Sequence, residues 1–161
     1  MLFNYCTILS LSERTEVQVN NFTEVGTFLN QAGIELKRAE RYRVFISLIV
    51  IDLSFTNEIF GSKAPEMKEE LIKLTQSNVR VSDLLSKVGE SKLVLLFPET
   101  SRQGAEVTSK RLAEIIRKRI SEILQHKVEN IIHLEMSSFP DTGGAKTIAT
   151  FLEELAEKSQ N

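Results

Sequence analysis

Residues able to carry out catalysis or to bind metals are few in this sequence and poorly grouped. Asp52 follows a run of apolar residues, and an acid at the end of a buried strand more often caps a neighbouring loop than binds a metal. His133 and Glu135 would share one strand face, but no third ligand is in register with them, and zinc sites use several protein ligands. His126 is isolated, and Cys6 has no neighbour that would activate a thiol. These residues alone predict neither a metal centre nor a nucleophile.

Basic residues are concentrated in one stretch of the second half, although the net charge of the chain is −2. They are Lys110, Arg111, Arg117, Lys118, Arg119 and Lys127. Neither aromatic residues nor glycines are interleaved with these charges, as a protein that binds single-stranded nucleic acid would usually require. A solvated helix face is therefore favoured over a phosphate or nucleic-acid patch, and no nucleic acid is expected as a partner.

Length and composition indicate one globular domain. The chain has 161 residues, of which 42% are hydrophobic and 26% are charged, which is enough for a core and a charged surface. A single cysteine cannot form an internal disulfide, which favours a reducing, cytoplasmic location. The longest apolar run, residues 44–51, is too short to span a bilayer, and the N-terminus lacks the basic segment of a signal peptide. No membrane span is expected.

Hydrophobic periodicity predicts the elements that would position these residues. Apolar residues at helical spacing predict four helices, and dense or alternating apolar residues predict four strands. The helices are expected at about residues 24–42, 62–77, 102–125 and 147–158, and the strands at 44–53, within 79–88, at 92–97 and at 128–139. Gly89 and Glu90 should form the turn between the second and third strands. Residues 1–23 are interpreted as an N-terminal extension that contains a strand or hairpin.

The order of these elements predicts an α+β fold. After the first helix the order is βαββαβ, the ferredoxin-like or palm order, with a central antiparallel sheet flanked by helices. The two crossover helices should cover one face of the sheet, because such crossovers are right-handed. The fold alone implies no activity, since this scaffold serves many unrelated functions.

Several short motifs follow one another at consistent spacing. Residues 35–42 (ELKRAERY) match ELxRAxRY, 48–53 match a strand that ends in DxD, 80–84 match RxSD, 95–100 (LLFPET) match LLPxT, and 138–140 match an SxP turn. In this order they resemble GGDEF (diguanylate cyclase) domains, from about residue 24 to residue 158. We therefore assign residues 24–161 to a GGDEF-like domain that follows the extension 1–23.

The signature that gives GGDEF domains their name is degenerate in this chain. The resemblance implies an enzyme that joins two GTP molecules, with divalent metal held by one carboxylate at the end of the first strand and another in the hairpin turn. Asp52 matches the first carboxylate. Ser91 replaces the acid of the turn, and the ammonium group of Lys92 would repel a divalent cation, so Asp52 is interpreted as vestigial. The signature positions are occupied by Gly89, Glu90, Ser91, Lys92 and Leu93.

Other positions that the family uses are also changed. Ser54 replaces the second acid of DxD, and Phe60 stands where an asparagine would recognise guanine. Residues 17–25 keep almost nothing of the DxLTGLxNR pattern, and the last helix lacks the ALYxAK stretch with its phosphate-contacting lysine. We therefore expect no cyclase activity, no bound metal and no cofactor.

One ligand site of the family is matched. GGDEF domains often carry an RxxD site for their product, cyclic di-GMP. Arg80 and Asp83 match this site, and Arg111 stands at the position of a further arginine. Arginine can bind phosphate oxygens or a guanine edge with two hydrogen bonds, and a carboxylate can accept hydrogen bonds from guanine N–H groups. In the alternative interpretation, Asp83 caps the entry to a strand and Arg80 forms a weak surface ion pair with it.

The resemblance leaves two functions open, and the two can coexist. The first is a catalytically inactive GGDEF-like domain in bacterial signalling, which acts through protein–protein contacts with an unknown partner or within a homodimer. The second is a receptor for cyclic di-GMP that uses Arg80, Asp83 and Arg111.

Overall fold

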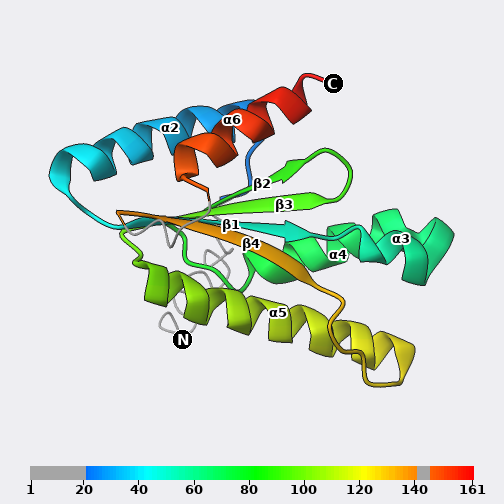
Figure 1. Ribbon diagram of the computed structural model, residues 1–161. Helices are drawn as coiled ribbons and strands as arrows, with labels where there is room; N and C mark the ends of the chain where they lie inside the picture. The colour runs from blue at the N-terminus through cyan, green and yellow to red at the C-terminus, as the bar shows by residue number, and fades with distance from the viewer. Residues whose placement is uncertain (1–20, 141–145) are drawn as a thin grey trace, which may run out of the picture.

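A four-stranded antiparallel sheet forms the centre of the part that the computed structural model describes, residues 21–140 and 146–161 (Figure 1). The strands are β1 (Ile46–Asp52), β2 (Leu84–Val88), β3 (Lys92–Pro98) and β4 (His133–Phe139). Their spatial order is β2-β3-β1-β4. β1 therefore lies inside the sheet and pairs with β3 on one side and with β4 on the other.

Helices cover both faces of this sheet (Figure 1). α2 and α6 lie on one face, and α4 and α5 lie on the other. The short helix α3 and the 3-10 turn η1 connect β1 to α4. The bounds are α2 (Val25–Tyr42), α3 (Phe55–Phe60), η1 (Gly61–Lys63), α4 (Ala64–Gln76), α5 (Arg102–Leu124) and α6 (Ile148–Ser159).

β1 is buried on both faces, which accounts for its almost unbroken apolar sequence. Ile46, Leu48 and Val50 belong to the core cluster under α2 and α6, whereas Ile49 and Ile51 belong to the cluster under α4 and α5. None of these side chains is more than 5% exposed. The alternation follows from strand geometry, in which successive side chains point to opposite faces of a sheet. Both helical layers are therefore needed to exclude water from this one strand.

Ser47 is the polar residue inside the apolar run of β1, and it ties the strand to two neighbouring segments. It is fully buried, and its Oγ atom lies 2.8 Å from the Oγ atom of Ser138 on β4. It also donates to the carbonyl oxygen of Thr100 at 2.8 Å. A buried hydroxyl without partners would be costly, so these contacts stabilise the core. They also hold the loop between β3 and α5 against the start of β1.

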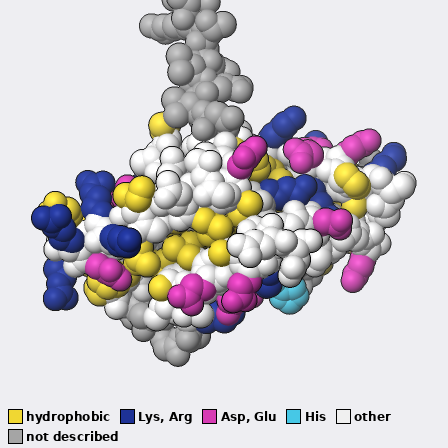
Figure 2. All heavy atoms as spheres, turned by 90° about the horizontal axis from the view of Figure 1, so that it is seen from above, with side chains coloured by type: hydrophobic (Ala, Val, Ile, Leu, Met, Phe, Trp, Pro, Cys, Tyr) yellow, Lys and Arg dark blue, Asp and Glu magenta, His cyan; other side chains and the backbone are white. Residues whose placement is uncertain are grey.

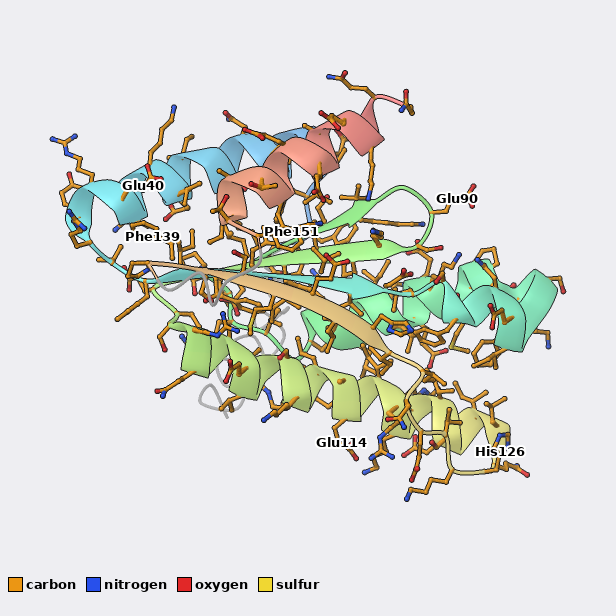
Figure 3. The ribbon with its side chains drawn as sticks, in the orientation of Figure 1. Glu40, Glu90, Glu114, His126, Phe139 and Phe151 are labelled. Carbon is orange, nitrogen blue, oxygen red and sulfur yellow. The ribbon has the colours of Figure 1, made fainter. Side chains whose placement is uncertain are left out.

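β2 and β3 form the expected hairpin. Val88 pairs with Lys92, so Gly89, Glu90 and Ser91 form the loop between the two strands. Gly89 has a φ of +61°, a left-handed conformation that glycine adopts without the steric penalty of a Cβ atom. Glu90 lies at the tip of the loop and points away from the sheet (Figure 3). The loop thus extends beyond the sheet, and the Glu90 side chain does not cover the end of β1.

The expected α+β fold with βαββαβ order is confirmed, and α4 and α5 share one face of the sheet. Two expectations were wrong in detail. The sequence did not predict α3, and it began the last strand at residue 128, whereas β4 begins at His133. Val128 lies in the preceding loop, where its N–H donates to Ser121 Oγ at 3.1 Å while its side chain packs on the core. Residues 1–20, with most of the expected N-terminal extension, lie outside the described residues.

The face formed by α2 and α6 has an apolar middle and charged ends (Figure 2). Leu29 and Leu36 of α2 and Leu152 of α6 are partly buried here and pack against the core cluster beneath the two helices. The apolar stripe therefore belongs to the packing of these helices on the sheet. In the described part of the chain no helix has both the length and the apolar character needed to cross a membrane.

Leu95→Ala is expected to lower the free energy of unfolding by about 2–5 kcal/mol, because it removes a fully buried side chain from β3 and leaves a cavity. Urea denaturation followed by circular dichroism would measure this change. Ile34→Ala is the control, since Ile34 is 58% exposed on α2 and its removal should change stability by no more than about 0.5 kcal/mol. Similar losses in both variants would contradict the assigned core.

Candidate functional site

An open pocket of about 810 Å³ lies between the segment that precedes β2 and the first turns of α5. Its volume is within the usual range of small-molecule sites. Arg80, Asp83 and Arg111, the three residues that the sequence pattern placed in one ligand site, all line this pocket. Its wall is completed by residues after α4, at the end of β3 and at the start of α5, which include Asn78, Phe97, Thr100 and Ser101.

Arg80 and Asp83 are joined by a tight turn in front of β2. The Arg80 N–H donates to Asp83 Oδ2 at 2.8 Å, and the Asp83 N–H donates to the Arg80 carbonyl oxygen at 3.1 Å. Asp83 thus caps the entry to the strand, as the alternative interpretation expected. The contact uses the backbone of Arg80, however, and within the described part of the chain the exposed Arg80 guanidinium has no hydrogen-bond partner. Its side chain is therefore available to a ligand.

Asp83 is a buried carboxylate in the pocket wall. It is 3% exposed, and its Oδ1 atom has no hydrogen-bond partner among the described residues. Burial raises the pKa of Asp83, and the hydrogen bond from the Arg80 N–H and the charges of Arg80 and Arg111 offset only part of this rise. An unpaired buried acceptor costs free energy, so a ligand that brought an N–H group to Oδ1 would recover a hydrogen bond.

Arg111 closes the pocket from the side of α5. Its Nη2 atom donates to the carbonyl oxygen of Asn78 at 3.0 Å, which ties α5 to the chain that leads into the Arg80 turn. Arg111 is exposed, and a guanidinium group has five N–H donors in all, so further donors remain for a ligand. The pocket therefore carries two arginine side chains beside one buried carboxylate.

The N-terminus of α5 forms another part of the wall. Ser101 caps this helix, and its Oγ atom accepts a hydrogen bond from the Gly104 N–H at 3.3 Å. A Cβ atom at position 104 would lie 3.1 Å from Thr100 Cγ2, so glycine allows the preceding loop to pack closely on the helix. The partial positive charge at the N-terminus of a long helix favours anions, and it adds to the charge of Arg80 and Arg111.

Asp52 lies at the other end of the β2–β3 hairpin from this pocket. In the sheet register it faces Lys92 on β3 and His133 on β4. Its Oδ1 atom accepts a hydrogen bond from the Ser54 N–H at 2.8 Å, so it caps the loop that follows β1. Burial by itself would raise the pKa of Asp52, but the hydrogen bonds from Ser54 and the charges of Lys92 and His133 outweigh it and lower the pKa below its ordinary value.

Among the described residues, Asp52 does not belong to a cluster of metal-binding side chains. The described part of the chain contains no group of three or more His, Cys, Asp or Glu residues that could hold a metal ion. The Ser91 carbonyl oxygen accepts a hydrogen bond from the Leu53 N–H at 2.7 Å, and Phe60 packs against the core cluster. On α4 the buried Lys68 donates to Asn57 Oδ1 at 2.9 Å. The positions compared with the family's site are therefore occupied by neutral, aromatic or cationic side chains, apart from Asp52.

Acidic side chains pair with two arginines of the basic stretch of α5. Arg117 pairs with Glu114, and Arg119 pairs with Glu70 of α4 and with Glu122. Glu114 lies on the outer side of α5 (Figure 3). These contacts support the interpretation of a solvated helix face, because ion-paired arginines at a surface leave less positive charge for nucleic acid.

Sequence reasoning missed parts of the pocket. Ser101 could have been found, because a serine directly before a long helical pattern is an N-cap signal. Asn78 contributes its backbone carbonyl group, which no side-chain pattern can reveal. The segments after α4 and before α5 therefore become part of one site only through the fold.

Solved structures resemble this chain, although no family model and no curated protein matches it. The active GGEEF domain of a diguanylate cyclase from Vibrio cholerae is 28% identical over 79% of this chain and 81% of that chain, with a TM-score of 0.52. The diguanylate cyclase SiaD from Pseudomonas aeruginosa, in complex with its activator SiaC, is 16% identical, with a TM-score of 0.61. The match covers 99% of this chain but 62% of the SiaD chain.

A further similar structure is the GGDEF domain of DgcB from Caulobacter crescentus in complex with c-di-GMP. It is 13% identical over 88% of this chain and 81% of that chain, with a TM-score of 0.58. The SiaD and DgcB matches show the shared fold, and the Vibrio cholerae match adds sequence identity over most of both chains. They agree with the motif order found in the sequence. The chain is therefore similar to GGDEF domains and shares their fold.

Proposed function

We propose that this chain is a non-catalytic GGDEF-like signalling domain that binds cyclic di-GMP between the Arg80 turn and α5. The observation that carries the proposal is the convergence of Arg80, Asp83 and Arg111 on one pocket of about 810 Å³. The whole β2–β3 hairpin separates Asp83 from Arg111 in the chain, so their convergence depends on the fold. A turn stabilised for folding alone would not require an arginine from α5 at the same pocket.

The chemistry of the pocket fits a guanine dinucleotide. Such a ligand has phosphate oxygens, which Arg80, Arg111 and the N-terminus of α5 can bind through N–H groups and positive charge. Its guanine bases have ring and amino N–H groups, which can donate to the unpaired Oδ1 atom of Asp83. Each guanidinium group can also stack on the face of a base. The pocket therefore offers complementary groups to both the phosphates and the bases of the ligand.

The absence of catalysis is supported by the charges at the end of β1. Phosphoryl transfer from GTP requires metal ions to neutralise several negative charges, and magnesium is bound mainly by carboxylate oxygens. Asp52 is one carboxylate, and it already faces Lys92 and His133. Ser91 supplies no charge to a metal. A cation of the protein thus stands beside the position where the second acid of the family would be.

Output through a protein partner is part of the same proposal. The SiaD structure contains an activator protein, and the DgcB domain contains c-di-GMP. We infer that this chain, in the bacterial cytoplasm, changes its contacts with a protein partner or with a second copy when the dinucleotide binds. In this proposal, cyclic di-GMP acts on the domain by binding at the pocket and not at the end of β1.

Isothermal titration calorimetry with cyclic di-GMP is expected to show binding, and Arg80→Ala and Arg111→Ala should each weaken it about tenfold or more. The physical reason is the loss of charge-assisted hydrogen bonds, each worth roughly 1.5–3 kcal/mol. Arg117→Ala is the matched control, because it removes the same charge from α5 at a residue that pairs with Glu114. Its affinity should stay close to that of the wild type.

Two results of this titration would overturn the proposed ligand. One is a wild-type protein that produces no heat at high micromolar cyclic di-GMP. The other is equal weakening in Arg111→Ala and Arg117→Ala, which would indicate attraction by general positive charge. A parallel titration with GTP, which carries a single guanine, tests whether two bases are required.

Asp83→Asn is expected to stabilise the protein at neutral pH while it weakens binding. The amide oxygen can still accept from the Arg80 N–H, but the cost of a buried charge disappears. Because the folded-state pKa of Asp83 is raised, its contribution to stability is present below its ordinary value of 3.8 and is lost as the pH rises through the folded-state pKa. The stability of wild type relative to Asp83→Asn should therefore fall from pH 4 to pH 7, as measured by urea denaturation at each pH. An increase over this range would contradict the pKa assignment.

Incubation of the purified protein with GTP and Mg²⁺ or Mn²⁺ is expected to produce no cyclic di-GMP above a protein-free blank. The reason is the electrostatic one given above, since Lys92 stands beside the position of the missing acid. Chromatography with mass detection would measure the product. Any product that depends on the protein and disappears in Asp52→Asn would contradict the non-catalytic assignment.

A further inference from the structure

Asn21 links the pocket to the chain that precedes α2. It is 8% exposed, and its Nδ2 atom donates to the carbonyl oxygen of Arg80 at 3.2 Å. Its own carbonyl oxygen accepts from the Leu85 N–H at 3.0 Å, and the Thr23 N–H donates to the Leu85 carbonyl oxygen at 2.9 Å. Residues 21–23 therefore lie along the outer edge of β2 through backbone contacts, and one side chain reaches from them to the ligand-binding turn.

The contact from Asn21 completes the fixation of Arg80. The Arg80 N–H is bonded to Asp83 Oδ2, and the Arg80 carbonyl oxygen accepts from both the Asp83 N–H and Asn21 Nδ2. A carbonyl oxygen has two lone pairs, so both can be used. The backbone of Arg80 is thus held on both sides, while its guanidinium has no hydrogen-bond partner among the described residues. On the other side of the turn, Arg111 bonds to the carbonyl oxygen of Asn78.

We propose that Asn21 is a positioning residue for the pocket and that it couples ligand binding to the docking of residues 21–23 on β2. The inference rests on the proposed function, because it says how the same site is organised and which segment ligand binding stabilises. A ligand held by Arg80 and Asp83 stabilises the turn in the conformation that Asn21 binds. By reciprocity, whatever strengthens the docking of residues 21–23 then increases affinity for the ligand.

Preorganisation is the physical basis of this role. A binding group that is ordered before the ligand arrives loses less entropy on binding, so affinity is higher. The Arg80–Asp83 turn is short and lies at the surface, and two of its hydrogen bonds close within the turn itself. The Asn21 side chain adds a hydrogen bond to the turn from a segment that is distant in sequence and lies beside β2. Loss of this hydrogen bond should widen the range of turn conformations while the backbone pairing with Leu85 remains.

Asn21→Ala tests the proposal through two measurements on one variant. Calorimetry with cyclic di-GMP should show an affinity about three- to tenfold lower than that of the wild type, as expected for one lost hydrogen bond. Hydrogen exchange in the ligand-free protein should be faster at the Asp83 amide, whose acceptor is the Arg80 carbonyl oxygen. Exchange at the Leu85 amide should change much less, because its acceptor is the backbone carbonyl of Asn21, which the variant keeps.

Ser137→Ala is the matched control. Ser137 is fully buried on β4 and pairs with Leu48, which belongs to the core cluster under α2 and α6. Its Oγ atom donates to the Lys146 carbonyl oxygen at 2.5 Å, so its removal deletes a comparable hydrogen bond on the face of the sheet opposite to α5 and the pocket. This variant should lose stability without losing affinity. Unfolding midpoints of both variants show whether a change in affinity merely follows a loss of stability.

Three outcomes overturn the positioning role. They are unchanged affinity in Asn21→Ala, equal acceleration of exchange at Asp83 and Leu85, and equal loss of affinity in Ser137→Ala. If the wild type binds no dinucleotide, the proposed function fails and the coupling to ligand fails with it. The exchange measurement on the ligand-free protein still decides separately whether Asn21 orders the turn. In the binding protein, added ligand should slow exchange at Thr23 and Leu85, and no slowing would contradict the coupling.

Discussion

The burial of β1 on both faces is the constraint on which the rest of the structure depends. A strand whose successive side chains point alternately into two apolar layers must lie inside a sheet and beneath helices on both sides. β3 and β4 are its neighbours, and β2 lies outside β3 as an edge strand. This order decides which loops meet: the β2–β3 turn reaches the end of β1, and the loop before α5 reaches its start through Ser47 and Thr100.

The two ends of the β2–β3 hairpin can therefore change independently. β2 spans Leu84–Val88, a length of roughly 13 Å at about 3.3 Å per residue, and the Debye length at physiological salt is about 8 Å. Charges at the Lys92 end are thus largely screened from the pocket at the Arg80 end. The paired strands between them also keep the pocket geometry fixed. A domain of this kind can lose the acids of one end while the arginines of the other remain in place.

Local patterns in the sequence were sufficient for the long elements and insufficient for the short ones. A dense apolar run is enough to predict β1, and a periodic pattern of 23 residues is enough to predict α5. The six residues of α3 contain too few turns to show a helical period. Val128 was mistaken for part of β4 because an apolar residue that packs on the core from a loop looks like a strand residue. The fold class did not depend on either error.

The candidate site, too, could be predicted only in part from local sequence patterns. Motif spacing singled out Arg80, Asp83 and Arg111, but Asn21 and Asn78 meet them across 59 and 33 residues of sequence, which no local pattern records. The buried Asp83 carboxylate has a cost for folding that bears on its role. A charge held in a buried position with an unpaired oxygen weakens the free protein, so folding alone gives no reason to keep it when an amide would also cap the turn. Under the proposed function, a ligand that donates to that oxygen would supply the reason, because the complex would recover the free energy that the unpaired oxygen costs the free protein.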